Sequence, residues 1–222
     1  MPNWCENVLE ISHEDPRMMD RLEQASARGR ILTEFIPCPS ELHITAGRSG
    51  NALEQTKIEL QEQFNLKKFG HKNWYDWQVE KWGTKWDIGD KDGGQFDRDT
   101  PTQARIVFES AWSPPVEGIR ALCQQHGFTA TMLYYEGGEN YCGKYDSEED
   151  TDDFYSLGNY ATVEELEAAI PKCIDEQFCL SQQLDEWLQE QEAEEEDNDF
   201  ETDENESDNA PDNPSANNGP SL

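Results

Sequence analysis

The sequence predicts an α+β protein in which helices cover one face of an antiparallel sheet. Apolar and polar side chains alternate with period two in several short segments, which is the pattern of strands. Between these segments, apolar residues recur every three or four positions behind capping residues, which is the pattern of helices. The 222 residues suffice for one domain of ordinary size with an appendage.

The first half of the predicted sheet is a strand, a helix and a second strand. Residues 4–12 alternate, so they are predicted to form the first strand. Pro16 follows two acidic residues, an arrangement that opens a helix, and Gly29 ends that helix. Residues 30–36 are predicted to form the second strand, which ends at Pro37 because proline has no backbone donor.

A helical insertion is predicted at about residues 40–103. Asn51 caps its first helix, whose apolar spacing gives it one inward face. The residues predicted to face inward are Leu53, Leu60 and Phe64. Residues 89–100 are polar and lack periodicity, so they are predicted to form a loop.

The insertion contains the densest cluster of tryptophans in the chain. Residues 73–87, NWYDWQVEKWGTKWD, hold four of the seven, and their spacing predicts a helix that Gly83 ends in a left-handed conformation. Two interpretations stay open: a core helix, or a recognition surface of rings around a few charges. Both hold if the helix packs inward and the residues after it point outward. The inward set is Trp74, Val79 and Trp82, and the outward set is Lys85, Trp86 and Asp87.

The second half of the predicted sheet repeats the strand, helix and strand. Residues 105–111 alternate, prolines 114 and 115 open a helix that Gly127 closes, and residues 128–135 alternate again. Together the two halves give the β-α-β-β-α-β order of a ferredoxin-like, split β-α-β fold with an insertion. This domain is predicted to span residues 1–145, with the other face of the sheet open or covered by the insertion.

A mainly helical extension is predicted at residues 146–189. Edge strands are predicted near residues 141–145, before the extension, and near residues 154–157, within it. Thr162 and Glu165 form a capping box, and Pro171 is expected to bend the helix that follows.

Residues 190–222 are predicted to be a disordered acidic tail. They contain thirteen Asp or Glu and no Lys or Arg, and too few large apolar side chains to offset the entropy of ordering. The whole chain has a formal net charge of -31, which disfavours direct binding to nucleic-acid phosphates. The charge is compatible with a basic protein partner, although a tail that only maintains solubility is the commoner explanation.

The first residues lack the basic and apolar regions of a signal peptide, and no apolar run is long enough to cross a membrane. The sequence therefore predicts a cytoplasmic protein with no membrane contact. Six cysteines are spread along the chain without a CxxC pair, so no metal site is predicted, and nothing indicates a cofactor.

Four blocks of sequence carry a resemblance to a known family. They are MPNWCEN at the start, WYDW with WGTKWD, FESAWSPP at 108–115 and YYEGGENYCG at 134–143. In this order they resemble the YubB-like family of phage and plasmid proteins, although Glu136-Gly137-Gly138 stands where that family has a proline. The resemblance implies a ferredoxin-like domain and an origin in a mobile element. The family has no established activity that could be carried over.

Part of the tryptophan-rich stretch is predicted to form an aromatic cleft with the ends of two strands. Stacking and a few hydrogen bonds in such a cleft suit a base, a nucleoside or an aromatic side chain of a peptide. The alternative is that these residues only fasten the insertion to the sheet. The predicted site residues are Tyr75, Asp76, Trp82, Lys85, Trp86, Asp87, Trp112, Tyr135 and Glu136.

The sequence shows no phosphate loop, nucleophile motif or metalloprotease motif, and this favours a non-enzymatic protein. The leading hypothesis is a phage or plasmid accessory protein that binds a host macromolecule. One version is an acidic inhibitor of a host defence or DNA-processing protein, with a basic nucleic-acid-binding protein as the partner. The alternative hypothesis is a small-ligand or nucleotide-binding or processing protein that uses the cleft around Lys85, Trp86 and Asp87.

Overall fold

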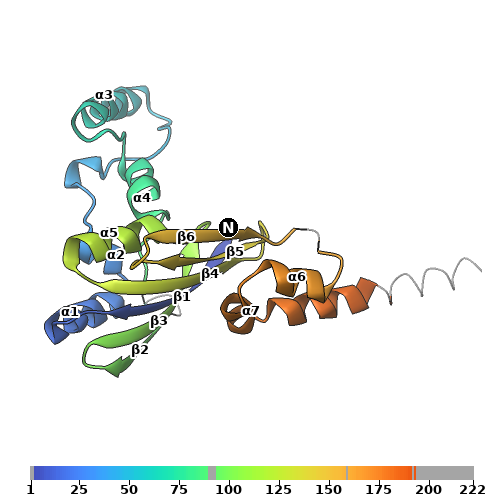
Figure 1. Ribbon diagram of the computed structural model, residues 1–222. Coiled ribbons are helices and arrows are strands. Elements are labelled where there is room, and N and C mark those ends of the chain that lie inside the picture. Colours follow the sequence, from blue (N-terminus) through green and yellow to red (C-terminus); the bar gives the residue numbers. More distant parts are fainter. Residues whose placement is uncertain (1–2, 90–93, 159, 192, 194–222) are drawn as a thin grey trace, which may run out of the picture.

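A computed structural model describes residues 3–89, 94–158, 160–191 and 193. Its centre is a six-stranded sheet with the order β2-β3-β1-β4-β5-β6, in which all neighbours are antiparallel (Figure 1). The strands are β1 (Trp4–Ser12), β2 (Gln95–Thr100), β3 (Gln103–Ala111), β4 (Thr129–Glu136), β5 (Tyr141–Asp146) and β6 (Thr151–Ser156). The helices are α1 (Pro16–Ser26), α2 (Ile31–Phe35), α3 (Ala52–Phe69), α4 (Trp74–Trp82), α5 (Val116–His126), α6 (Val163–Ala169) and α7 (Lys172–Phe178), with a 3-10 turn η1 (Ser40–Leu42). A further helix covers residues 180–191.

The predicted fold class is confirmed. Strands β2, β3, β1 and β4 stand in the order of a ferredoxin-like sheet, and α1 and α5 connect them in split β-α-β fashion. Strand β1 is central, since it pairs with β3 along one side and with β4 along the other. The β5–β6 hairpin widens the sheet beyond the four strands of the basic motif.

The second strand of the motif is not the predicted one. Residues 31–35 form α2 rather than a strand, because the side chain of Asp87 accepts hydrogen bonds from the first-turn amides of Leu32 and Thr33. The strand is instead β2, which lies in the predicted polar loop and pairs with β3 at the edge of the sheet. Its sequence, QFDRDT, is exposed or half-buried throughout, so it carries no apolar alternation.

Two apolar cores lie on opposite faces of the sheet. Cys5, Leu9 and Ile11 of β1 point into the larger core, which α1, α2 and α5 cover. Val8 points into the smaller core beneath α6, α7 and the last helix. The second face is therefore covered in part by the C-terminal helices, and not by the insertion (Figure 1).

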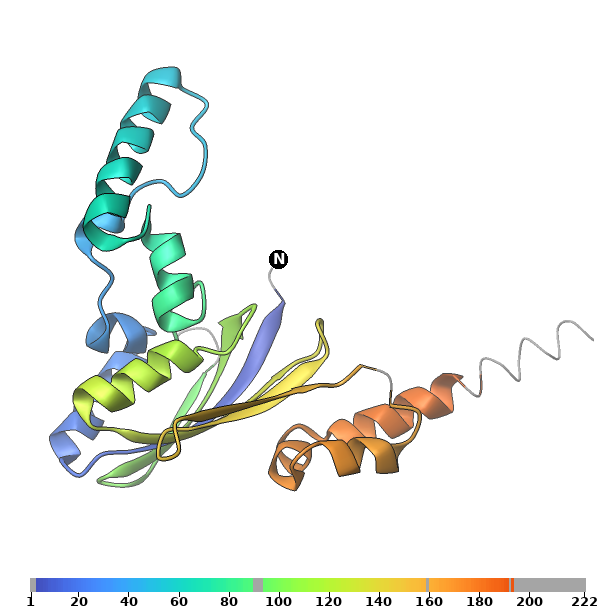
Figure 2. The ribbon, with the colours of Figure 1, turned by 45° about the horizontal axis from the view of Figure 1, so that its top comes forward.

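Helices α3 and α4 extend away from the sheet (Figure 2). The predicted inward face of α3 is wrong: its residues Leu53, Leu60 and Phe64 are 78, 62 and 52 % exposed. The buried residues of α3 are Ile58 and Asn65, and the side-chain amide of Asn65 donates to the backbone oxygens of Glu41 and Lys72. The helix ends at Gly70, which is left-handed with φ 79°.

The C-terminal region divides at Pro171. Half of the predicted capping box is present, since the Thr162 hydroxyl accepts from the amide of Glu165. The Glu165 carboxylate accepts from the amide of Ala161, one residue before the Thr162 amide that a capping box uses. Pro171 separates α6 from α7, so it ends one helix instead of bending it. Residues 194–222, which make up most of the predicted acidic tail, lie outside the described residues.

The cap of α2 gives a test of the fold. Replacing Asp87 by Ala removes the acceptor of the Leu32 and Thr33 amides, and we expect the free energy of unfolding to fall by about 1–3 kcal/mol. Asp153→Ala is the matched control, since Asp153 is an exposed aspartate of β6, and its effect should stay within about 0.5 kcal/mol. Urea unfolding of both variants measures the difference, and equal values would contradict the assignment.

Candidate functional site

The end of α4 is fixed to the core by its last tryptophan. Trp82 is 1 % exposed, and its indole N–H donates to the backbone oxygen of Ile36 at 2.9 Å. Gly83 then ends the helix with φ 80°, and a side chain there would lie 3.0 Å from the backbone oxygen of Pro114. A glycine is therefore required at this position both by conformation and by space.

The residues after Gly83 make further buried contacts. The hydroxyl of Thr84 donates to the backbone oxygen of Ala111 at 3.0 Å, and the hydroxyl of Ser113 donates to the backbone oxygen of Gly83. These two bonds join the segment to the end of β3 and to the turn before α5. They set the direction in which the next two side chains point.

Asp87 points into the protein and not into the predicted cleft. One carboxylate oxygen accepts from Leu32 N at 2.7 Å and the other from Thr33 N at 2.9 Å. Burial raises the pKa of the Asp87 carboxyl above its usual value, and the amide donors oppose that rise. Because its lone pairs are already used, Asp87 serves as the cap of α2.

Between these anchors, Lys85 and Trp86 face a surface groove of about 600 Å³. The Lys85 ammonium lies 4.8 Å from the ring centre of Trp86, 4.8 Å from that of Trp112 and 5.9 Å from that of Tyr75. These are cation–π distances. No hydrogen-bond acceptor or carboxylate pairs with the ammonium in the part of the chain that is described, so its N–H donors are available to a ligand. The groove is lined by Ala46, Gly47, Asn73, Trp74, Tyr75, Asp76, Lys85, Trp86 and Trp112.

Three tryptophans around the groove keep much of their surface in solvent. Trp4, Trp86 and Trp112 are 41, 40 and 42 % exposed. Trp4 and Trp86 contact each other with ring centres 5.7 Å apart. Large aromatic side chains that are this exposed and this close together are typical of binding surfaces.

The backbone of Trp112 is in an unusual conformation. Its φ is 70°, which is uncommon for a bulky side chain. Two hydrogen bonds hold this backbone conformation. The backbone N–H of Trp112 donates to the backbone oxygen of Asn3, and the backbone oxygen of Trp112 accepts from the hydroxyl of Tyr141. The strained backbone turns the indole toward Lys85, and such strain is common at functional sites.

The structure brings together five of the nine predicted site residues: Tyr75, Asp76, Lys85, Trp86 and Trp112. It does not place Trp82, Asp87, Tyr135 or Glu136 in the groove. Glu136 is 1 % exposed and accepts from the amides of Gly138 and Glu139, so it stabilises the β4–β5 turn. Tyr135 lies on the opposite face of the sheet against Phe178, and burial raises the pKa of its hydroxyl.

The groove also contains residues outside the predicted site. The loop at Ala46 and Gly47 lines it, and so does Trp74, which was predicted to point inward. Trp4 lies at the edge of the groove, in contact with Trp86. Trp4 lies on β1 beside β3, and the antiparallel pairing of Trp4 with Ala111 carries it next to Trp112. Trp4 could have been predicted at the groove if the first strand had been paired with residues 103–111.

Two further features bear on the chemistry of the described residues. Within them, no three His, Cys, Asp or Glu side chains gather as metal ligands do. Their helices do not combine the length and the apolar composition that a membrane span needs.

Residues 81–170 match the family model described as the ferredoxin-like domain in Api92-like protein. This agrees with the sheet described above, and the Api92-like match includes Lys85, Trp86 and Trp112 but not Tyr75 or Asp76. A solved structure, protein api92 from Yersinia pseudotuberculosis, is similar at 14 % identity with a TM-score of 0.39 over 72 % of this chain and 99 % of that one. No curated protein matches the chain. The resemblance to the YubB-like family stays a prediction.

The two kinds of tryptophan can be separated by unfolding experiments. Trp82→Ala should lower the free energy of unfolding by about 3–5 kcal/mol, because it removes a buried ring and a buried hydrogen bond. Trp86→Ala should cost about 1 kcal/mol or less, since Trp86 is 40 % exposed and loses its contacts with the ring of Trp4 and the ammonium of Lys85. Two equally large losses in urea unfolding would show that Trp86 only fastens the insertion.

Proposed function

We propose that this protein acts by binding a partner protein through the aromatic groove, that is, the groove of Tyr75, Asp76, Lys85, Trp86 and Trp112 with Trp4 at its edge. The observation that supports the proposal most is that the Lys85 ammonium lies between two exposed indoles, Trp86 and Trp112, which are 40 and 42 % exposed. The 41 % exposed ring of Trp4 contacts Trp86 and extends the aromatic surface. Tryptophan and tyrosine supply much of the affinity at protein interfaces, because they bury a large area with few rotatable bonds.

The positions of the carboxylates favour binding over catalysis. A catalytic site needs an acid or a base that can reach the substrate. Asp87 and Glu136, which the sequence suggested for such roles, accept backbone N–H groups at structural caps. Asp76 is the carboxylate that stays at the groove, where it can accept a hydrogen bond or pair with a cation of the partner.

The overall charge favours a basic partner. With a net charge of -31, the protein attracts a positively charged surface from a distance and raises the rate of encounter. A basic nucleic-acid-binding protein of a bacterial host has that character, whereas a nucleic acid itself would be repelled. The origin in a phage or plasmid, the host cytoplasm and the inhibitory role rest on the sequence and form part of the proposal.

The groove proposal is tested by capture with matched variants. Tagged full-length protein is incubated with bacterial lysate, beside a Lys85→Ala/Trp86→Ala variant and a Leu53→Ala control. Leu53 is 78 % exposed on α3, so its change removes a similar exposed apolar group outside the groove. We expect the double variant to retain the specific partner at least about tenfold less well, and the control to retain it as the wild type does.

Two measurements can contradict the proposal: the dependence of capture on salt, and capture by the double variant. Retention should fall steeply as salt rises, because the attraction is partly between exposed charges. Equal capture by wild type and double variant would show that the groove is not the binding surface. Retention that does not change with salt would remove charge as the basis for choosing the partner.

The N–H donors of the Lys85 ammonium, unpaired within the described residues, favour a second function, the binding of a small ligand. An ammonium between two indoles suits a small ligand that has a planar ring and an anionic group, such as a nucleotide. Because the Asp87 carboxylate caps α2, the groove supports binding of such a ligand better than its processing.

Tryptophan fluorescence separates this ligand class from the partner protein. Adenosine monophosphate should quench emission in a saturable way, adenosine should bind at least about tenfold more weakly, and Lys85→Met should remove the difference. Absence of quenching by the nucleotide, or equal binding of the nucleoside, would leave the partner protein as the occupant.

A further inference from the structure

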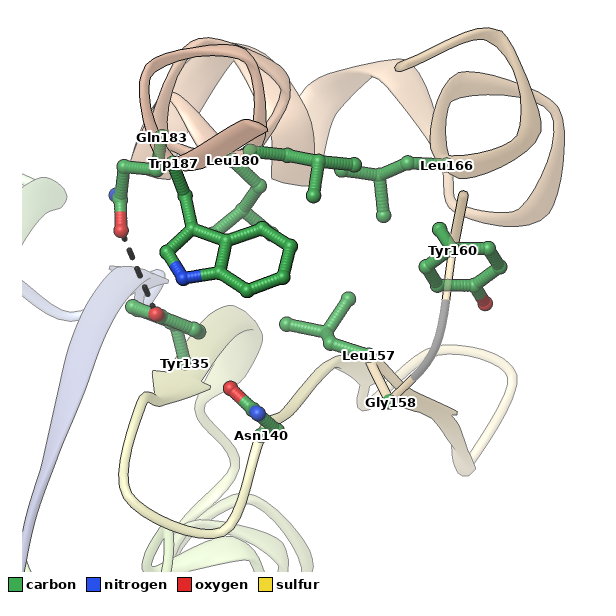
Figure 3. Close-up of a pocket in the computed structure, with 10 residues that line it drawn as sticks. Tyr135, Asn140, Leu157, Gly158, Tyr160, Leu166, Leu180, Gln183 and Trp187 are labelled. Atoms are coloured by element: carbon green, nitrogen blue, oxygen red, sulfur yellow. Dashed lines mark hydrogen bonds between the residues drawn. The ribbon is translucent and has the colours of Figure 1, made fainter. Parts of the chain in front are cut away.

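A second pocket, of about 510 Å³, lies on the opposite side of the sheet from the aromatic groove. It is formed between the ends of β4 and β6 and the C-terminal helices, and Figure 3 shows its side chains. Its volume falls within the range of about 300–1,000 Å³ that is typical of small-molecule sites. The proposed function does not use this pocket.

The pocket exists because the last helix runs past the end of the sheet. Leu180, Leu184 and Trp187 lie on one face of that helix at intervals of four and three residues. Leu180 is 4 % exposed above the sheet, whereas Trp187 is 53 % exposed although it lines the same pocket. The apolar face of the helix therefore extends over a space that the strands do not fill.

One end of the pocket is apolar. Leu166 is 3 % exposed at its base, and Leu157, which follows β6, lies opposite Leu166 (Figure 3). The ring of Tyr160 lies at the same end. This end suits a hydrocarbon chain or ring, because burial of apolar surface contributes about 25 cal/mol per Å².

The other end is polar but carries no charge. The hydroxyl of Tyr135 lies 3.5 Å from the side-chain oxygen of Gln183, whose amide donates to the backbone oxygen of Phe178. The side-chain amide of Asn140 and the indole N–H of Trp187 lie on the same side of the pocket (Figure 3). Neither has a hydrogen-bond partner within the described part of the chain, so both are free to bind a ligand.

We propose that this pocket binds a neutral amphipathic small molecule, with an apolar body and an amide, ester or hydroxyl head. The leucines hold the body, and Asn140 and Trp187 bond the head. Among the described residues, no Lys, Arg, Asp or Glu lines the pocket, so a charged head would lose its hydration without an ionic partner there. The net charge of -31 also disfavours a carboxylate head where no cation offsets it.

Octanamide and octanoate are the probes that test this proposal, because they share a chain and differ in the charge of the head. Full-length protein is titrated with each at neutral pH, with tryptophan emission and the melting temperature as readouts. We expect saturable octanamide binding with a dissociation constant at or below about 1 mM, and octanoate binding at least about tenfold weaker.

Two variants locate the bound molecule. Asn140→Gly keeps the left-handed backbone of this residue, with φ 54°, and removes the amide, so octanamide should bind about tenfold more weakly. Trp187→Ala should weaken binding to a similar extent and abolish most of the emission change. Trp86→Ala, in the aromatic groove, is the control that should bind octanamide as the wild type does.

The proposal is overturned by any of three results: no saturable binding of octanamide, equal binding of octanoate, or octanamide binding that Trp86→Ala removes and the two pocket variants do not. Because Trp187 is 53 % exposed and Asn140 lies at a turn, both variants should melt close to the wild type. Their melting temperatures without probe check that a loss of binding is not a loss of folding.

Discussion

The buried anchoring of residues 82–88 is the constraint on which the rest of the structure depends. Trp82 donates a hydrogen bond to the residue after α2, and Thr84 donates one to the end of β3. Asp87 accepts one from the start of α2. Ile88 adds a backbone bond to Ile31, so the same short stretch joins the insertion, the sheet and the helical layer. Each of these bonds is largely shielded from water, where an unmade hydrogen bond costs most.

This anchoring explains why Lys85 and Trp86 are presented to solvent. They stand between residues whose side chains are committed to the interior, so they have no room in the core and turn outward. Trp112 meets them because its own backbone is held in a left-handed conformation. The same short segment therefore contains both residues packed in the core and the outward-facing side chains of the aromatic groove.

The parts of the fold that follow local rules could be predicted from the sequence, and the parts set by distant contacts could not. Alternation identified β1, β3 and β4, and proline and glycine signals marked α1 and α5. Residues 31–35 are rich in residues that favour strands, and only a carboxylate more than fifty positions later makes them a helix. Strand β2 is a polar edge strand in which Phe96 is the apolar residue that packs against the larger core, and one apolar residue gives no periodic signal.

In the candidate site, too, the side chains that distant contacts position could not be placed from the sequence. Trp86 is exposed as predicted, but Val79, predicted to point inward, is 41 % exposed. Asp87, predicted to point outward, is drawn inward by amides that the sequence does not connect to it. Tyr135 and Trp112 end neighbouring regions of the sheet, yet Tyr135 belongs to the face that packs on Phe178. Which face a strand-end residue takes depends on the register of pairing, and a shift of one residue reverses it.

Hydrogen exchange of the indole N–H groups, followed by nuclear magnetic resonance, tests this account most directly. Each of the seven tryptophans gives its own signal. The indole N–H of Trp82 should exchange as slowly as the amides of β1, while those of Trp86 and Trp112 should exchange at the rate of exposed groups. Slow exchange at all three would show that the indoles form one closed core, and the aromatic groove would not exist in solution.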